Sequence, residues 1–450
     1  MASIARAVAR FKDHPQEHLD PRLVHEACAV AGHVWRNRLL DPVTTLGLML
    51  LQVLHGNASC RAVGRLSGLS FSVTAYCKAR SRLPVDVLGC VAALLTHRAR
   101  EHTRDVGRWL GHRVLLIDGT GVSMPDTPGL QRVFGRPGNT KAGCGFPVMH
   151  VLWVFDAATG LIVDHVASRW NRHDLADASK MHPMLEAGDV LVGDRAFGSY
   201  AHLVLLLQSQ LHGVFRVHQR LIVDFTPGRK AKKQKAKRRR TGTPSSRYLK
   251  RLGGLDQLVE YIKPKTRPKW MTREQYAQLP GAVTVRELRY TVQRKGYRTH
   301  EVTLVTTLVD PRTYPKESLA GLYQSRWQIE TNLGHLKTTM RMDVLRCKHP
   351  DGVMKELWAY MMVYNLVRLL MLDAAKRQGA SPDRVSFIDA LDVLRHRSPD
   401  EPVPTLTINP HRPGRHQPRV IKRRKDRYRV MTRPRHEYHA EVVDDESLAA

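Results

Sequence analysis

The stretch Gly321–Arg341, GLYQSRWQIETNLGHLKTTMR, contains no proline, and its pattern predicts one long helix. Four polar residues follow one another in it at offsets of 0, 3, 7 and 14: Tyr323, Arg326, Glu330 and Lys337. At about 100° per residue, these positions fall within about 60° of one another on a helical wheel. One face of the predicted helix therefore presents a phenol, a guanidinium, a carboxylate and an ammonium group.

The same stretch also allows a simpler interpretation. Its apolar residues could bury the helix in a core: Leu322, Trp327, Ile329, Leu333 and Leu336. The polar face would then be a solvated stripe, in which an exposed pair such as Arg326 and Glu330 contributes only about 0.3–0.5 kcal/mol. The helix alone does not decide between a functional polar face and a solvated surface stripe, so the rest of the chain must be considered.

The chain is strongly basic. Its 450 residues include 72 Lys and Arg against 41 Asp and Glu, which gives a formal net charge of +31. Such an excess favours a polyanionic partner, with nucleic acid first and an anionic membrane surface second. The length predicts about two to four domains, and the hydrophobic fraction of 42% is enough to form buried cores.

Nothing in the sequence predicts secretion or a membrane span. The N-terminal residues MASIARAVARFKDHP contain arginines but no apolar segment typical of a signal peptide. The best apolar run, Leu357–Leu372, is interrupted by Asn365 and Arg368. The six cysteines form no CxxC pair, which argues against a disulfide scaffold or zinc knuckle and favours reduced thiols. We therefore expect a cytoplasmic protein that acts on nucleic acid.

Residues 1–105 are predicted to form a helical DNA-binding region. Within it, Ser59–Arg82 has the pattern of two helices joined by a glycine turn, which resembles a helix-turn-helix. The second helix carries three basic residues that we assign to DNA binding: Lys78, Arg80 and Arg82. The alternative is an ordinary antiparallel helix pair with a solvated basic face.

Residues 106–220 change to short apolar runs typical of buried strands. His112–Ile117 is such a run and ends on Asp118; Asp189–Gly193 is another and leads into Asp194. Between them lie a predicted hairpin and a predicted helix, and a further helix and strand follow. This order predicts a mixed α/β fold, with parallel and antiparallel strands in one sheet that helices cover.

The remainder divides into three parts by composition. Residues 221–312 are predicted to be a β-rich insertion that contains the basic run Arg229–Arg240, nine basic residues in twelve, which we expect to be disordered without a polyanion. Residues 313–398 contain the polar-faced helix and further helices. Residues 399–450 are rich in proline and arginine and are predicted to be a flexible basic tail.

The two strand-end aspartates predict a metal site. If the strands of Asp118 and Asp194 are neighbours, the carboxylates lie a few ångströms apart, where they repel by about 1–4 kcal/mol at 4 Å. Either one carboxyl is protonated or a cation lies between them. For ligands that are all hard oxygen atoms, that cation is expected to be Mg²⁺ or Mn²⁺.

Glu330 is the candidate for a third carboxylate, from a helix packed beside these strands. Glu317 and Asp343 each lie 13 residues from Glu330, which puts them about 140° away from its face. Three carboxylates that hold two metal ions suit in-line attack at a phosphodiester, with no protein nucleophile.

The polar residues near these three acids can then be assigned to DNA binding. Arg326 and Lys337 could grip phosphates beside the scissile one, and Tyr323 could hydrogen-bond or stack. Arg195, which follows Asp194, joins the predicted DNA-binding set.

The motif Tyr323-x2-Arg326-x3-Glu330-x6-Lys337 resembles the YREK signature of insertion-sequence transposases of the IS-four group, in the DDE superfamily. The contexts of both aspartates, LLIDGTG and VGDR, resemble the same group. The resemblance covers roughly residues 20–400. It implies an RNase H-like catalytic core with a β-rich insertion between the second aspartate and the glutamate, flanked by helical N- and C-terminal regions.

By this resemblance, Asp118, Asp194 and Glu330 would bind two Mg²⁺ ions, and the other three signature residues would contact the transposon end. Such enzymes cut double-stranded DNA at terminal inverted repeats and join the 3′ ends to target DNA. Because two ends must come together, we expect a homodimer in the DNA complex.

Three other functions remain as alternatives. An RNase H-like nuclease or resolvase would cut without strand transfer and would not need the YREK stripe. A non-catalytic, transposase-derived DNA-binding protein would be expected to lack one of the three acids. A basic RNA-associated protein would explain the charge but not the strand-end aspartates.

Overall fold

The computed structural model of the chain describes residues 20–104, 106–138, 144–229, 246–292, 301–396, 404–410, 432–434, 436–438 and 440. The predicted basic run beyond Arg229 and most of the predicted tail 399–450 lie outside these residues.

One nine-stranded sheet forms the centre of the molecule, in the order β3-β2-β1-β4-β5-β9-β8-β7-β6. β1 pairs antiparallel with β2, and β2 with β3, whereas β1, β4 and β5 are parallel to one another. The remaining strands, β9 to β6, are antiparallel. The strands are β1 Val114–Ser123, β2 Val148–Asp156, β3 Ile162–Arg169, β4 Val190–Gly193, β5 His212–Arg216, β6 Ser246–Gly253, β7 Asp256–Ile262, β8 Ala282–Thr291 and β9 Glu301–Thr306. The mixed α/β fold class is confirmed, and the first five strands have the RNase H-like arrangement.

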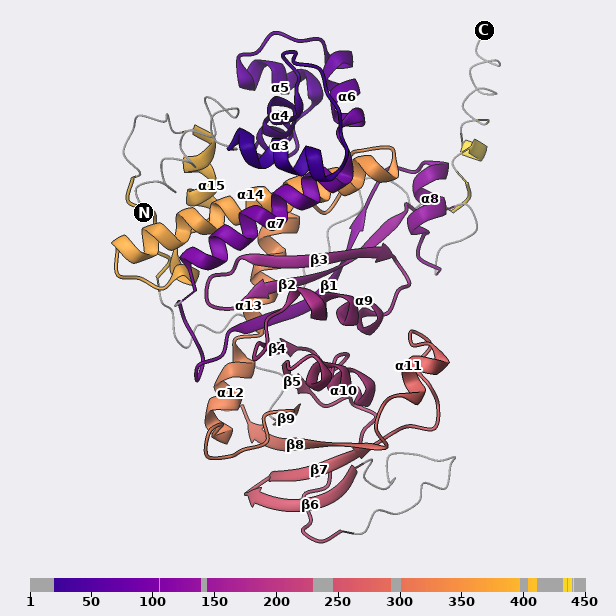
Figure 1. Cartoon of the computed structure of the whole chain (residues 1–450), viewed down its shortest axis with the longest axis vertical. Helices are drawn as coiled ribbons and strands as arrows, with labels where there is room; N and C mark the ends of the chain where they lie inside the picture. Colours follow the sequence, from indigo (N-terminus) through magenta and orange to yellow (C-terminus); the bar gives the residue numbers. More distant parts are fainter. Residues whose placement is uncertain are drawn as a thin grey trace.

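Helices cover both faces of this sheet (Figure 1). α7, α13 and α14 lie on one face and α9 and α10 on the other, while α3 to α6 pack beyond α7 and α14, away from the sheet. The helices are α3 Pro21–Val30, α4 Pro42–Leu54, α5 Cys60–Ser67, α6 Val73–Arg82, α7 Val85–His102, α8 Pro128–Phe134, α9 Asp174–Met181, α10 Tyr200–Gln208, α11 Arg273–Ala277, α12 Lys316–Gln324, α13 Trp327–Gly334, α14 Pro350–Arg377 and α15 Phe387–His396.

The alternation of side chains along β1 builds a separate core on each face. Leu116 belongs to the core beneath α13 and α14, whereas Leu115 and Ile117 belong to the core beneath α9 and α10. The parity of a residue number on β1 therefore decides which layer its side chain meets.

α14 is the central helix of the first core. It is long and apolar enough to cross a membrane by length and composition, but 72% of its most apolar window is buried inside the molecule. The two polar residues that interrupt its apolar run bind the hairpin β2–β3. Asn365 accepts a hydrogen bond from the backbone N–H of Ile162 (2.8 Å) and donates one to its carbonyl (2.9 Å). Arg368 donates to the carbonyl of Thr159 (3.0 Å).

We expect Gly160→Ala to destabilise the protein by about 2–3 kcal/mol. Gly160 has a φ of +69°, and a Cβ atom there would clash with the guanidinium of Arg368, which is only 1% exposed. Urea denaturation measures the effect. Gly281→Ala is the matched control, because its surroundings are open and its φ is not positive, and it should change stability little. Equal midpoints for the two variants would contradict this account.

The helix-turn-helix pattern in the N-terminal region is confirmed as local structure. The side chain of Ser59 caps α5, that of Ser72 caps α6, and Gly68 adopts a φ of +66° between them. Of the three basic residues of α6 that we assigned to DNA binding, Arg80 is only partly exposed. Its guanidinium turns inward and donates to Gln52 Oε1 (3.2 Å) and Cys347 Sγ (3.1 Å).

Two expectations about the segments that carry the candidate site residues also need correction. β1 does not end at Asp118 but continues to Ser123, because β2 pairs with it along its whole length. The stretch Gly321–Arg341 is not one helix: α12 ends at Gln324, α13 begins at Trp327, and residues His335–Thr339 form a π-helical turn. At the break, Ser325 Oγ donates to the carbonyl of Leu322 (2.6 Å), a local bond that competes with regular helix.

Candidate active site

The register between β1 and β4 brings the two aspartates together. Ile117 pairs with Gly193 in the parallel ladder, so Asp118 and Asp194 are the next residues on neighbouring strands. By alternation both side chains lie on the face that carries α13, the same face as the side chains of the core beneath α13 and α14. The predicted neighbourhood of the two strands is confirmed.

Asp118 is held in an environment that disfavours its charge. Its pKa is raised to about 6: burial is the largest cause and the nearby carboxylate of Asp194 adds to it, while the N–H of Gly119 (2.8 Å) and the guanidinium of Arg326 oppose the shift. Asp194 accepts a hydrogen bond from the N–H of Ala196 (2.7 Å). Burial and the neighbouring carboxylate therefore both disfavour the charged form of Asp118, and a bound cation would stabilise that form.

This shift predicts a pH-dependent effect of Asp118→Asn on stability. The folded pKa of Asp118 lies near 6, above the ordinary 3.8, so the folded state holds this proton more tightly than the unfolded state does. The contribution to stability is full below about pH 4 and is lost as the pH rises through 6. Asp118→Asn should therefore be more stable than wild type at pH 7.5, and the gain should shrink between pH 6 and pH 4.

Urea denaturation with a chelator present, at several pH values, measures the difference. Asp310→Asn is the control of opposite sign, because hydrogen bonds from Thr313 and Arg312 lower the pKa of Asp310. That variant should lose stability at pH 7.5. A gain for Asp118→Asn that does not vary with pH would contradict the assigned environment.

Three signature residues reach this region from the broken helix. Tyr323 is buried, and burial raises the pKa of its hydroxyl, with Arg326 and Asp194 among its charged neighbours. Arg326 Nη2 donates to Glu330 Oε1 (3.1 Å), with 14% of the arginine side chain and 47% of the glutamate side chain exposed. The expected ion pair is confirmed. Trp327, expected to help bury the helix, is 43% exposed instead.

Lys337 attaches the π-helical turn to β1. Its Nζ donates to Thr120 Oγ1 and to the carbonyl of Gly121, both at 3.0 Å. These contacts are two and three residues beyond Asp118 on the same strand. π-turns are frequent at functional sites, and this one holds the end of the helix against the strand of the first aspartate.

The other predicted DNA-binding residues lie apart from these contacts. Arg195 is adjacent to Asp194 but donates to Gln219 Oε1 (2.6 Å) at the surface. Lys78 and Arg82 are exposed on α6, in the N-terminal helical region. The structure thus brings Tyr323 and Arg326 close to the aspartates, attaches Lys337 to the strand of Asp118, and binds Glu330 to Arg326. The α6 residues lie on a separate surface.

Sequence reasoning missed a contact between two polar side chains next to Gly119. His150 Nε2 lies 2.9 Å from Asp174 Oδ1, and a Cβ atom on Gly119 would lie 2.6 Å from both atoms. Asp174 is also among the charges that raise the pKa of Asp118. The available signal was the glycine directly after Asp118, which permits this close approach.

The fit of the residues to metal ions is partial. Asp118 and Asp194 form the paired, hard-oxygen donor set that Mg²⁺ prefers, and burial together with the neighbouring carboxylate disfavours the charge of Asp118 in the absence of a cation. Glu330 does not complete the set: in the described part of the chain, no three His, Cys, Asp or Glu side chains are placed to hold one metal ion. Its carboxylate is instead bound to Arg326.

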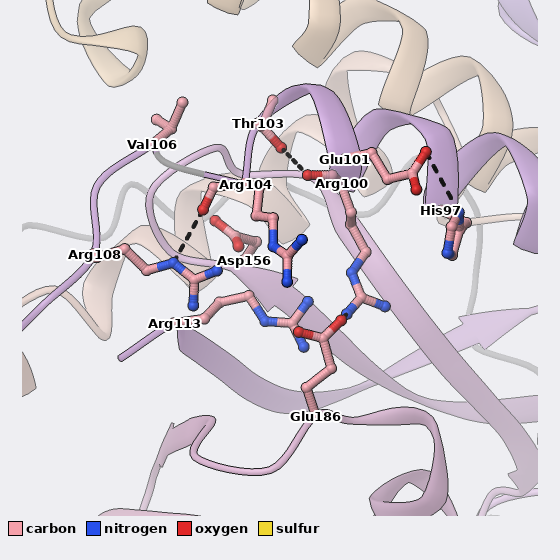
Figure 2. Close-up of a pocket in the computed structure, with 10 residues that line it drawn as sticks. All are labelled: His97, Arg100, Glu101, Thr103, Arg104, Val106, Arg108, Arg113, Asp156 and Glu186. Atoms are coloured by element: carbon pink, nitrogen blue, oxygen red, sulfur yellow. Dashed lines mark hydrogen bonds and ion pairs between the residues drawn. The ribbon is translucent and has the colours of Figure 1, made fainter. Parts of the chain in front are cut away.

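A polar pocket of about 180 Å³ lies where α7 meets the start of β1, and Figure 2 shows several arginine side chains pointing into it. Its charges are largely compensated within the protein. Arg100 pairs with Glu186, Arg113 with Asp189 just behind it, and Asp156 accepts from the backbone of its own turn. The pocket therefore joins α7 to the sheet rather than presenting a one-sided charge.

Comparison with known proteins agrees with this geometry. Residues 109–366 match the family described as the transposase DDE domain, and the chain belongs to that family. The matched segment includes both aspartates and all four signature residues, and DDE transposases generally use divalent metal ions.

The relationship extends beyond this domain. The transposase InsG for insertion sequence element IS4 of Escherichia coli (strain K12) is 26% identical over 443 residues, which cover 92% of each chain. The resemblance to IS-four-group transposases is thereby confirmed. A cryo-EM structure of piggyBac transposase, in a synaptic complex with hairpin DNA, shares 10% identity at a TM-score of 0.39, over 87% of this chain and 78% of that one. That likeness is too distant to carry a functional comparison.

Proposed function

We propose that this transposase cleaves double-stranded DNA at the terminal inverted repeats of its element and joins the 3′ ends to target DNA, in the cytoplasm. The observation that carries the proposal is the register Ile117–Gly193, which places Asp118 and Asp194 side by side under the helix of Glu330. A paired acid site at a strand end, on a chain of net charge +31, suits chemistry on a polyanion.

Asp118, Asp194 and Glu330 are the residues that would hold two Mg²⁺ or Mn²⁺ ions. Such ions activate a water or 3′-hydroxyl for attack and stabilise the leaving oxygen of a phosphodiester. The surrounding side chains of the protein hold the segments of the site in position. Lys337 fixes the π-helical turn after α13 to β1, and Tyr323 packs beside Arg326.

The N-terminal region offers a groove suited to the DNA backbone. It has a volume of about 630 Å³, an aromatic floor that includes Trp35 and Phe71, and basic residues from the α3–α4 loop and α6: Arg36, Arg38, Lys78 and Arg82. The one acidic side chain among the lining residues, Asp41, is engaged in capping α4. The groove is thus positively charged on balance, which favours phosphate contacts.

We expect the double variant Lys78→Glu/Arg82→Glu to weaken DNA binding about 10–100-fold at low salt and to reduce the slope of log K against log salt by about 2. Fluorescence anisotropy with a labelled duplex measures both quantities. Arg61→Glu/Arg65→Glu makes the same charge change on the neighbouring helix α5, outside the groove, and should weaken binding much less. Equal losses would show that only overall charge matters.

The proposal is tested by incubating the full chain with Mg²⁺ and duplex DNA that carries the element's own ends. Cleavage at the repeat boundary followed by joined products supports a transposase, and sizing of the protein–DNA complex tests the expected homodimer. Cleavage without joined products would favour the nuclease or resolvase. Binding without cleavage would favour the non-catalytic DNA-binding protein.

A further inference from the structure

The two aspartates of the candidate metal site are already in place, whereas the glutamate is not. Asp118 and Asp194 are fixed by neighbouring strands, and each accepts a hydrogen bond from a nearby backbone N–H. Glu330 stands on a helix, is about half exposed, and has Arg326 as its hydrogen-bond partner in the described part of the chain. The third carboxylate is therefore the movable one.

Arg326 is placed to control where that carboxylate goes. Its side chain is only 14% exposed, and besides Glu330 its charged neighbours include Asp118 and Tyr323. One hydrogen bond of 3.1 Å engages a single nitrogen with Glu330, although a guanidinium has five N–H donors. A phosphate group offers it two parallel charge-assisted bonds and is the stronger partner.

We infer that Arg326 is a positioning residue that holds Glu330 away from the two aspartates until a DNA phosphate engages its guanidinium. Release of Glu330 then lets it join Asp118 and Asp194, so that the three-carboxylate metal site forms only when substrate is bound. This inference rests on the proposed function, since it names DNA phosphate as the releasing group. By linkage, DNA must raise metal affinity by the same factor as metal raises DNA affinity.

The first test measures Mn²⁺ binding to the full chain without DNA, from the loss of the free Mn²⁺ signal in electron paramagnetic resonance. Arg326→Gln should bind Mn²⁺ about three- to tenfold more tightly than wild type, because Glu330 is released. Arg195→Gln is the matched control: it removes a positive charge next to Asp194 but leaves the pair of Arg326 and Glu330 intact. It should have a smaller effect.

A double-variant comparison separates release of the glutamate from simple loss of charge. In a Glu330→Gln background, Arg326→Gln should raise Mn²⁺ affinity clearly less than in the wild-type background. Equal effects in both backgrounds would overturn the inference, because Arg326 would then act only through its charge. Arg326→Lys keeps the charge beside Asp118 and serves as a second variant if thermal unfolding shows that Arg326→Gln is not folded. It should show an intermediate affinity.

The second test measures the coupling directly. Anisotropy with a labelled random-sequence duplex, which lacks the element's ends, gives DNA affinity with and without Mn²⁺. In wild type, Mn²⁺ should raise DNA affinity about three- to tenfold. In Arg326→Gln, the ratio of DNA affinities with and without Mn²⁺ should be close to the ratio measured for Glu330→Gln. A wild-type ratio no larger than that of Glu330→Gln would also overturn the inference. Neither test uses cleavage, so an inactive wild type on its own ends would count against the proposed function, while wild-type cleavage with no coupling would count against the inference alone.

Discussion

Asp194→Asn should lower the rate of cleavage at the element's ends by about 10²–10³-fold or more, with DNA binding and folding preserved. The amide has the shape of the carboxylate and can still accept the 2.7 Å hydrogen bond from the N–H of Ala196. It carries no negative charge, however, so one of the two fixed anionic ligands, Asp118 and Asp194, is lost. Single-turnover cleavage with saturating protein and Mg²⁺ isolates the chemical step.

Asp164→Asn is the matched control for this experiment. Asp164 lies on β3, two strands away from β1, and accepts a local hydrogen bond from the N–H of His165. Its replacement should leave the cleavage rate within about twofold of wild type, as expected for a residue remote from the reacting atoms. Wild-type cleavage by Asp194→Asn would rule out the proposed chemistry at this site.

Arg286→Met should destabilise the folded protein by about 3–5 kcal/mol. Arg286 on β8 is 1% exposed and binds both oxygens of Asp256 on β7, at 2.8 and 2.5 Å. It also donates to the carbonyl of Tyr314 (2.7 Å), directly before α12. The variant leaves a buried carboxylate and a carbonyl without their partner, and it frees the start of the helical segment that carries the signature residues.

Two comparisons show whether burial is the cause. The double variant Arg286→Met/Asp256→Leu removes both charges and should recover much of the lost stability. Arg247→Met breaks the pair with Glu260 on the adjacent strands, where the arginine side chain is 55% exposed, and should cost less than about 1 kcal/mol. Urea denaturation of the three variants gives the ranking, and a loss for Arg247→Met as large as that for Arg286→Met would contradict it.

The buried strands could be predicted from the sequence because their signal is local. The hairpin β2–β3, together with β4, β5 and β9, appears in the sequence as short apolar runs between turn residues, which is the pattern of buried strands. β6 was missed, because Ser246–Gly253 is an edge strand with mostly polar, exposed side chains and no apolar face. β1 was cut short because its second half contains two glycines, and only its pairing with β2 keeps it extended.

The pairing of the aspartates could be predicted for the same reason, whereas the partners of the basic residues could not. Each aspartate follows an apolar run, and parallel neighbours place such residues side by side. The binding of Lys337 to Thr120, 217 residues away, and of Arg80 to Cys347, 267 residues away, depends on how separate elements pack. A basic side chain has the same appearance in a sequence whether it meets solvent or a buried acceptor.

The continuous nine-stranded sheet fixes the distances between its outer strands and β1. β8 is four strands and β6 six strands from β1, which at about 4.8 Å per strand corresponds to about 19 and 29 Å. Measured along a duplex at 3.4 Å per base pair, that is about six to nine base pairs, less than one helical turn. Side chains on β8 to β6 are thereby held at a set distance from Asp118, because continuous strand pairing joins them to β1.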